Sequence, residues 1–214
     1  MNPVFITGGT GYVGRPLIEA LLKRGFAVYA LTRPESAPRL PSGARPVIGN
    51  ALDAATFAAA IPPGATFVHL VGTPHPNPAK AAEFRRVDLG SIKAAVTAAR
   101  DAGVQHFVYV SVAHPAPVMQ AYIAVRAEGE ALVRASGIRA TILRPWYVLG
   151  PGHRWPYLLL PVYAILRRAP MTRNGAERLG LVTRRDMVAT LVRAIEAPPA
   201  ETARVMEVPE IRQA

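Results

Sequence analysis

The feature that most constrains the fold is a glycine-rich run near the start of the chain, Thr-Gly-Gly-Thr-Gly-Tyr-Val-Gly at residues 7–14. The apolar, β-favouring residues 3–6 precede this run and predict a buried strand. Residues 15–24 follow with apolar side chains at helical spacing, Gly25 ends that helix, and residues 26–31 predict a second strand. The glycines therefore lie on a strand-to-helix turn inside a βαβ unit, which is the context of a dinucleotide-binding turn.

Three glycines of this run have separate expected roles. Gly8 allows a tight turn, Gly11 lets backbone N–H groups approach a pyrophosphate, and Gly14 lets the helix pack closely on the strand. The positive end of the helix dipole then faces the phosphates. The residues between these glycines are expected to border the same cofactor: Thr10, Tyr12 and Val13.

The rest of the chain alternates between strand patterns and helix patterns. Further strands are predicted at residues 45–50, 66–71, 105–112, 139–143 and 204–208. Helices are predicted at residues 54–60, 79–102, 118–135 and 184–197. Asp53 is expected to cap the first of these helices. The alternation predicts an α/β fold, a single Rossmann-type domain over residues 1–214 with a doubly wound parallel sheet.

Residues 146–183 break the alternation and are too few for a second full domain, so we expect a small cap on the substrate side. Its apolar stretch at residues 155–166 is too short to span a bilayer, which takes about 20 residues. We expect this stretch to form a pocket wall or a dimer face, with contact to a membrane surface as the less favoured alternative. Four residues here suggest an apolar, partly aromatic pocket: Trp146, Tyr147, His153 and Trp155.

Composition and charge narrow the class of protein. Hydrophobic residues make up 50% of the 214 and charged residues 18%, which excludes a disordered chain. Cysteine is absent, so disulfides and thiolate metal sites are excluded, and no metal site is expected. The start of the chain shows no signal-peptide pattern, so a cytoplasmic location is expected.

The net charge of +11 comes from 25 basic and 14 acidic residues, without a block of basic residues interleaved with aromatic ones. We therefore expect a small-molecule substrate and no nucleic acid. A monomer or a homodimer is expected.

Arg33 stands where the second predicted strand ends, about 20 residues past the glycines, where such a unit presents a side chain to the adenosine ribose. A guanidinium can bind a 2′-phosphate in a bidentate manner, and Arg15 directly follows the last glycine. These arginines favour NADP(H), while the nearby Glu35 keeps NAD(H) as the alternative. The competing interpretation of Arg33 is an exposed loop charge. Asn50 and Ala51, at the end of the third strand, are placed to meet an adenine edge.

A second group of residues has the chemistry for proton transfer. Tyr122 and Arg126 are four residues apart in a predicted helix, which places both on one face, and Ser111 ends the preceding strand. A cation lowers the pKa of a phenol, so that Tyr can exchange a proton with a carbonyl oxygen that the Ser hydroxyl orients. The competing interpretation is a packed Tyr122 beside a solvated Arg126. We expect Asp88 to be solvated or locally hydrogen-bonded, and His69 to be a core or edge residue and not a ligand.

Together these motifs resemble the short-chain dehydrogenase/reductase superfamily in its atypical or extended branch, which includes NmrA-like proteins and nucleoside-diphosphate-sugar epimerases. The matching stretches are residues 7–14, 108–111, 122–130 and 141–145. The resemblance implies a Rossmann fold whose first glycines hold the pyrophosphate. It also implies that residues after strands four to six line the nicotinamide, here Val71, Gly72 and Pro145.

The sequence departs from the family pattern at three positions and in its C-terminal substrate region, which is shorter than that of full-length extended members. Arg126 replaces the Lys of the Tyr-x-x-x-Lys motif, the active-site hydroxyl aligns with either Ser111 or Ala113, and the helical Asn aligns with Asp88. The resemblance implies hydride transfer on a small carbonyl, hydroxyl or sugar-nucleotide-like substrate, with Tyr122 as the acid or base. The arginine keeps a non-catalytic NADP(H)-binding sensor, regulator or assembly factor as the alternative.

Overall fold

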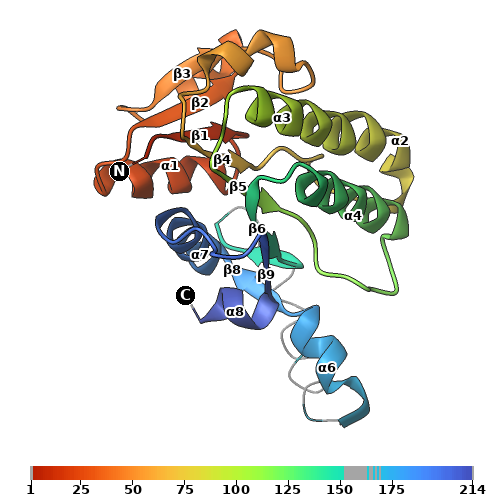
Figure 1. Ribbon diagram of the computed structural model, residues 1–214. Coiled ribbons are helices and arrows are strands. Elements are labelled where there is room, and N and C mark those ends of the chain that lie inside the picture. Colours follow the sequence, from red (N-terminus) through yellow and green to blue (C-terminus); the bar gives the residue numbers. More distant parts are fainter. Residues whose placement is uncertain (1, 152–162, 164–165, 167, 169, 214) are drawn as a thin grey trace.

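The computed structural model describes residues 2–151, 163, 166, 168 and 170–213. A seven-stranded parallel sheet runs through its centre in the order β3-β2-β1-β4-β5-β6-β9 (Figure 1). The strands are β1 (Val4–Thr7), β2 (Val28–Thr32), β3 (Arg45–Ile48), β4 (Thr66–His69), β5 (His106–Val110), β6 (Arg139–Arg144) and β9 (Ala203–Glu207). The chain runs outward from β1 to β3 and then crosses back to β4, which is the doubly wound order. The predicted fold class is confirmed.

Helices cover both faces of this sheet, as Figure 1 shows. The pair on one face is α1 (Gly14–Lys23) and α7 (Arg184–Glu196), and the pair on the other is α3 (Gly90–Asp101) and α4 (Gln120–Ala135). Successive side chains of β1 alternate between the two cores. Val4 and Ile6 pack in the core under α1 and α7, whereas Phe5 packs on Phe67 in the core under α3 and α4. Because both faces are covered, all four residues of β1 are buried.

Short elements connect the strands and helices. They are η1 (Pro34–Arg39), η2 (Ala54–Thr56), η3 (Ala58–Ala60), η4 (Pro78–Lys80), α2 (Ala81–Glu83), η5 (Phe84–Leu89), α6 (Pro170–Arg178) and α8 (Val208–Arg212). The helix predicted at residues 54–60 is wrong, because two 3₁₀ turns stand there instead. Phe57 separates them with a φ of −144°, since its buried ring stacks on Phe5 in the core. Asp53 does cap the first turn, accepting a hydrogen bond from the Ala55 N–H at 3.1 Å.

The long helix predicted at residues 79–102 is present as the unbroken series η4, α2, η5 and α3. Its middle segment, η5, is π-helical, a conformation that inserts an extra residue into a helical turn. Asp88 lies in this segment and is only 1% exposed. A solvated or locally hydrogen-bonded Asp88 is therefore wrong, because the partners of its side chain lie 15 and 38 residues away in the sequence and are described below.

The strand predicted at residues 204–208 is confirmed as β9, which pairs with β6 at the edge of the sheet. A separate two-stranded parallel sheet, β7 (Tyr147–Leu149) with β8 (Leu181–Thr183), was not predicted, because three-residue strands carry too little pattern. Of the apolar stretch at residues 155–166, only 163 and 166 are described, so the interpretations of it lie outside the described residues. No described helix is both long enough and apolar enough to cross a membrane.

Candidate functional site

The glycine turn is tight because its backbone packs against two neighbouring segments. Gly8 has a φ of +78°, and a Cβ on it would lie 2.8 Å from the carbonyl carbon of Leu70. A Cβ on Gly14 would lie 2.8 Å from the Cα of Gly9, so the first turn of α1 sits directly against the glycine run. The Gly11 N–H donates to the Gly8 carbonyl oxygen at 3.1 Å. Side chains at Gly8 and Gly14 would force these segments apart.

A groove of about 540 Å³ opens beside this turn at the carboxyl ends of the first strands; we call it the glycine groove. Predicted cofactor-binding residues that line it are Gly8, Thr10, Gly11, Arg33, Asn50, Ala51, Val71 and Gly72. Further lining residues that the sequence analysis did not single out include Thr32, Ser36 and Leu52. A groove that runs from a glycine turn at a helix start to the end of the second strand is where a Rossmann-type fold binds a nicotinamide dinucleotide.

The two arginines predicted to favour a 2′-phosphate are placed differently. Arg33 lines the glycine groove with a side chain 72% exposed, and its Nε lies 3.1 Å from a carboxylate oxygen of Glu35. Arg15 lines neither this groove nor the pocket described next, and it forms an exposed pair with Glu19 at 3.5 Å. Only Arg33 is therefore placed to contact a ligand in the groove.

A second hollow of about 530 Å³, the tyrosine pocket, brings together the three predicted catalytic residues. Predicted site residues that line it are Tyr12, Val13, Ser111, Tyr122, Arg126 and Pro145. The other described lining residues are Leu70, His75, Pro76, Asn77, Val110, Val112, Trp146, Tyr147 and Val148. Leu70, just beyond β4, also lines the glycine groove, so the two hollows meet there.

Arg126 is buried at the wall of the tyrosine pocket and is held by the protein itself. Its Nη2 donates to Oδ1 of Asp88 at 2.6 Å, and its Nη1 donates to the Val110 carbonyl at 3.0 Å. The other Asp88 oxygen, Oδ2, accepts from the backbone N–H and the hydroxyl of Thr73 at 3.1 Å and 2.6 Å. The alternative of a solvated Arg126 is thus wrong. The arginine links α4 directly to η5, and through Asp88 and Thr73 it links α4 to the loop after β4.

Arg126 stays positively charged although its side chain is buried. Burial disfavours the charged guanidinium, but Tyr122, Tyr109 and Asp88 outweigh that effect and hold the pKa of Arg126 above its ordinary value. The guanidinium carbon lies 5.1 Å from the centre of the Tyr122 ring, whose other neighbour is the ring of Phe84 at 4.9 Å. A cation therefore remains beside the Tyr122 ring throughout the accessible pH range.

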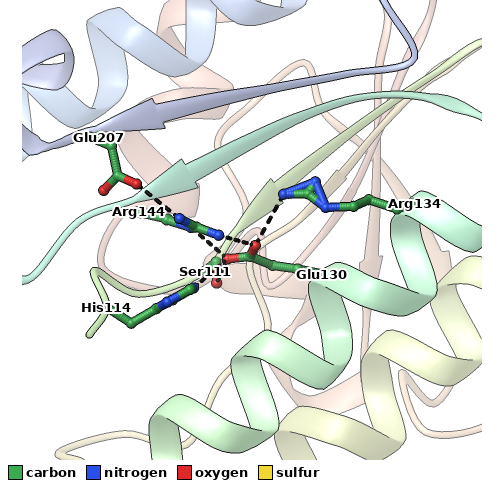
Figure 2. A network of polar contacts seen from close by, with 6 residues as sticks. All are labelled: Ser111, His114, Glu130, Arg134, Arg144 and Glu207. Carbon is green, nitrogen blue, oxygen red and sulfur yellow. Dashed lines mark hydrogen bonds and ion pairs between the residues drawn. The ribbon is translucent and has the colours of Figure 1, made fainter. Parts of the chain in front are cut away.

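Ser111 faces a carboxylate inside the protein. Figure 2 shows its hydroxyl directed at Glu130, to which it donates at 2.7 Å. Burial opposes the charge on Glu130, but hydrogen bonds from Arg144 and Ser111 outweigh it and lower the pKa of that carboxyl. An ionised carboxylate only accepts hydrogen bonds, so the Ser111 proton is committed and its oxygen can only accept from a ligand. Ala113, the alternative position for the hydroxyl, is fully buried and has none.

His69 is a core residue, as predicted. Its side chain is fully buried, and its Nδ1 lies 2.8 Å from the hydroxyl of Thr7 on the neighbouring strand. Burial, with a smaller contribution from the nearby Arg126 charge, lowers the pKa of His69 to about 3. The imidazole is therefore neutral and structural, and it lines neither hollow.

The buried partners of two predicted site residues, Arg126 and Ser111, were not predicted from the sequence. Asp88 was expected to be solvated or locally hydrogen-bonded and was matched to the family Asn, and Glu130 was named only as part of a matching stretch. The available signal was helical spacing from apolar residues, since Asp88 stands four residues after Phe84 and Glu130 three before Val133. A carboxylate on such a buried face requires a partner. Trp146 and Tyr147 do line the pocket as suggested, with ring centres 5.5 Å apart, whereas His153 and Trp155 lie outside the described residues.

Comparison with known proteins places this chain in a family. The family model described as NAD(P)H-binding matches residues 8–198. The chain therefore belongs to this NAD(P)H-binding family. The predicted resemblance is confirmed.

Two curated relatives are named as reductases. The 4-hydroxy-2-methyl-3-oxo-4-farnesyl-3,4-dihydroquinoline-1-oxide ketoreductase of Stigmatella aurantiaca is 31% identical over 168 residues, which cover 68% of this chain and 50% of that protein. The ceramide reductase of Caulobacter vibrioides is 29% identical over 199 residues, covering 91% of this chain and 61% of that protein. The chain thus spans only 50% to 61% of the length of these relatives.

Solved structures share the fold. The enzyme WbmH of Bordetella bronchiseptica, determined in complex with NAD⁺, superposes with a TM-score of 0.72 at 22% identity, covering 97% of this chain and 75% of that one. The UDP-glucose 4-epimerase of Thermus thermophilus, determined with NAD, gives 0.69 at 18% identity, covering 99% and 81%. Together, the family match and these structures show an NAD(P)-binding Rossmann-type fold in this chain.

Proposed function

We propose that this chain catalyses NADP(H)-dependent hydride transfer on a small carbonyl or hydroxyl compound. The observation that carries the proposal is the position of Tyr122 beside the charged Arg126 in a pocket that meets the glycine groove at Leu70. The two relatives named as reductases support it. Residues 146–183 act as the cap on the substrate side, since Trp146 and its neighbours begin that segment and line the pocket.

The proposed roles follow from the geometry of the pocket. When bound, the cofactor supplies or accepts the hydride at the nicotinamide ring. Tyr122 gives its proton to the carbonyl oxygen, and Arg126 stabilises the negative charge that the phenol then carries. Ser111, whose own proton goes to Glu130, accepts a hydrogen bond from the hydroxyl group of the alcohol.

Replacing Tyr122 with Phe tests these roles, with Tyr147→Phe as the matched control. Both variants lose one phenolic hydroxyl from the same pocket. Tyr122→Phe should lower kcat by about a hundredfold or more, whereas Tyr147→Phe should change it only a few-fold. NADPH binding, followed by cofactor fluorescence, should persist in both variants. Equal turnover in Tyr122→Phe and the unaltered chain would contradict the assigned mechanism.

We propose NADP(H) as the preferred cofactor because Arg33 is the arginine that lines the groove at the end of β2. A 2′-phosphate would replace the Glu35 carboxylate as its partner. Arg33→Ala should weaken NADPH binding about tenfold to a hundredfold and leave NADH binding unchanged. Arg15→Ala, which removes an arginine outside the groove, is the control and should change neither. Equal losses for NADPH and NADH in Arg33→Ala would argue against a 2′-phosphate contact.

A second candidate function is a non-catalytic NADP(H) sensor, regulator or assembly factor. The observation in its favour is that Asp88 and a backbone carbonyl already take up hydrogen bonds of Arg126. NADPH binding by calorimetry without turnover of any compound in a carbonyl panel, and with a co-purifying protein, would support it. Turnover that depends on Tyr122 would eliminate it.

A cytoplasmic monomer or homodimer stays our expectation. Cell fractionation tests the location, and light scattering of the purified chain tests the mass. A species larger than a dimer, or recovery in the membrane fraction, would contradict it.

A further inference from the structure

The wall of the tyrosine pocket is mainly apolar and aromatic. Its described apolar residues come from five segments: the glycine turn, the end of β4, the loop before η4, the end of β5 and the residues after β6. They are Val13, Leu70, Pro76, Val110, Val112, Pro145, Trp146 and Val148. Trp146 and Tyr147 meet edge to face with an interplanar angle of 71°, which forms an aromatic corner. Such a corner offers flat, apolar contact area to a ligand.

The pocket offers little charge to a ligand. Among its described lining residues, Arg126 is the only Arg, Lys, Asp or Glu. Asp88, whose side chain is fully buried, lies 2.6 Å from the guanidinium and neutralises it from the side of the protein. Burial also raises the pKa of Tyr147, so this phenol adds no charge. A diphosphate needs cations or several N–H donors, and the described wall does not present them.

Two polar side chains of the wall already bond within the protein. The hydroxyl proton of Ser111 goes to Glu130, and the side-chain oxygen of Asn77 accepts from the Ala79 N–H at 3.0 Å. Besides Arg126, the described lining then offers a ligand three phenols, one imidazole and the Asn77 amide N–H groups. A sugar ring, with a hydroxyl group on most of its carbons, would compete for these groups, and each hydroxyl left without a partner costs free energy. A neutral molecule with one carbonyl oxygen requires only the phenol of Tyr122.

We infer that the substrate is a neutral, lipophilic carbonyl compound with an aromatic or extended apolar body, and not a nucleotide sugar. The inference rests on the proposed function, since it names the substrate class of that reaction. NADPH would reduce the carbonyl: the hydride forms the new C–H bond, the Tyr122 proton goes to the oxygen, and the products are an alcohol and NADP⁺. The volume of about 530 Å³ falls within the range of about 300–1,000 Å³ typical of small-molecule pockets.

Binding of three probes to the whole chain tests this inference without relying on turnover. The probes are 2-acetylnaphthalene, which is flat and lipophilic, dihydroxyacetone, which is neutral but hydrophilic, and UDP-glucose. Calorimetric titrations are run on the free protein and again with NADP⁺ added. Only 2-acetylnaphthalene should bind saturably. Tighter or equal binding of UDP-glucose or dihydroxyacetone would overturn the inference, as would the absence of binding by all three.

Substitutions at Trp146 locate the bound ketone. Trp146→Ala should weaken binding of 2-acetylnaphthalene roughly five- to tenfold, and Trp146→Phe, which keeps an aromatic wall, should restore most of it. Val118→Ala is the control, since Val118 is 53% exposed and lies outside the pocket. Because Trp146 also packs on the core, thermal unfolding of each variant is compared with that of the unaltered chain. Unchanged ketone affinity in a folded Trp146→Ala would overturn the inference.

The same titrations separate this inference from the proposed function. If NADP⁺ binds but the aromatic ketone does not, the substrate class is wrong and the cofactor proposal stands. If the ketone binds in a Trp146-dependent manner but neither NADP⁺ nor NADPH binds, the lipophilic pocket is supported and the proposed reaction fails.

Discussion

Helix α4 carries two buried charges of opposite sign, one turn apart, and each fastens the helix to a different half of the molecule. Arg126 pairs with Asp88 of η5 and reaches the end of β5 through the Val110 carbonyl. Glu130 pairs with Arg144 at the end of β6, and Arg144 in turn pairs with Glu207 of β9 (Figure 2). Arg126 therefore holds α4 to the segment beside the tyrosine pocket, whereas Glu130 holds α4 to the last two strands of the sheet order, β6 and β9.

The two sites differ in how many partners share the charge. The side chains of Arg126 and Asp88 are 6% and 0% exposed, and among the described residues they form ion pairs only with each other. Glu130 instead belongs to the Glu130 cluster, which consists of Ser111, His114, Glu130, Arg134, Arg144 and Glu207. Losing one member of the Arg126–Asp88 pair leaves the other as an unpaired buried charge. Losing one member of the Glu130 cluster leaves Glu130 in contact with the remaining members. The pair that lines the pocket is thus the more fragile of the two.

The largest effect is expected for Asp88→Ala. It leaves the buried Arg126 cation unpaired and removes the acceptor of both Thr73 hydrogen bonds, so the free energy of unfolding should fall by about 3–5 kcal/mol. Urea unfolding measures the loss. The control is Asp101→Ala, the same substitution at the exposed end of α3, which should stay within about 0.5 kcal/mol. A loss in Asp88→Ala no greater than in the control would show that solvent or another group can neutralise Arg126.

The contrast between local and distant pairs explains what the sequence could predict. The glycine turn, the seven strands of the central sheet, and the i, i+4 spacing of Tyr122 and Arg126 are local patterns, and all of them are found in the structure. The partner of Arg126 is 38 residues away, so only the fold brings Asp88 to it. Phe57 shows the same limit, because packing on Phe5 in the core interrupts a stretch whose alanines favour a helix.

The residues of the candidate site also divide into those that local patterns place correctly and those that depend on contacts distant in the sequence. Most of the predicted cofactor-binding residues do line one of the two hollows, since their places follow from the ends of parallel strands. Arg15 does not, because its position in the first turn of α1 directs it to Glu19 at the surface. The commitment of the Ser111 proton to Glu130 depends on a helix 19 residues further along, which no local pattern reveals.

Glu130→Gln should cost less than the loss of Asp88, about 1.5–3 kcal/mol at neutral pH, because it removes one charge but keeps the shape of the side chain. The difference should depend on pH. The pKa of Glu130 is lowered from its ordinary value of 4.5, so its stabilisation is complete above that pH and is lost as the pH falls through the lower value in the folded chain.

The measurement is the difference in unfolding free energy between Glu130→Gln and the unaltered chain at a series of pH values. Burial lowers the pKa of His69 to about 3 and that of His106 to about 4, so both chains lose stability in acid as these groups are protonated on unfolding. That loss cancels in the difference. A difference that stays constant from neutral pH to well below 4.5 would contradict the role of the ionised carboxylate.

Arg144→Ala should have a smaller effect, about 1–2 kcal/mol, because Glu130 keeps its hydrogen bond from Ser111 and its ion pair with Arg134. Arg144 donates to both oxygens of Glu130 at 2.9 Å and 2.6 Å and to Glu207 at 2.9 Å. Arg144→Lys keeps the charge but cannot span both oxygens, so it should recover only part of the loss. Urea unfolding of the three chains checks this order. Full recovery by Lys would mean that charge alone, and not the bidentate geometry, anchors Glu130.

Arg134→Ala should have the smallest effect, within about 0.5 kcal/mol, although Arg134 contacts the same carboxylate. Its side chain is 40% exposed and its Nη2 lies 3.4 Å from Oε2 of Glu130, so water and salt screen the pair. The small loss should disappear in high salt, whereas the loss in Arg144→Ala should largely persist. Unfolding at two ionic strengths makes the comparison. If Arg134→Ala cost as much as Arg144→Ala, the buried bidentate contact of Arg144 would count no more than the exposed contact of Arg134, and Glu130 would depend equally on both arginines.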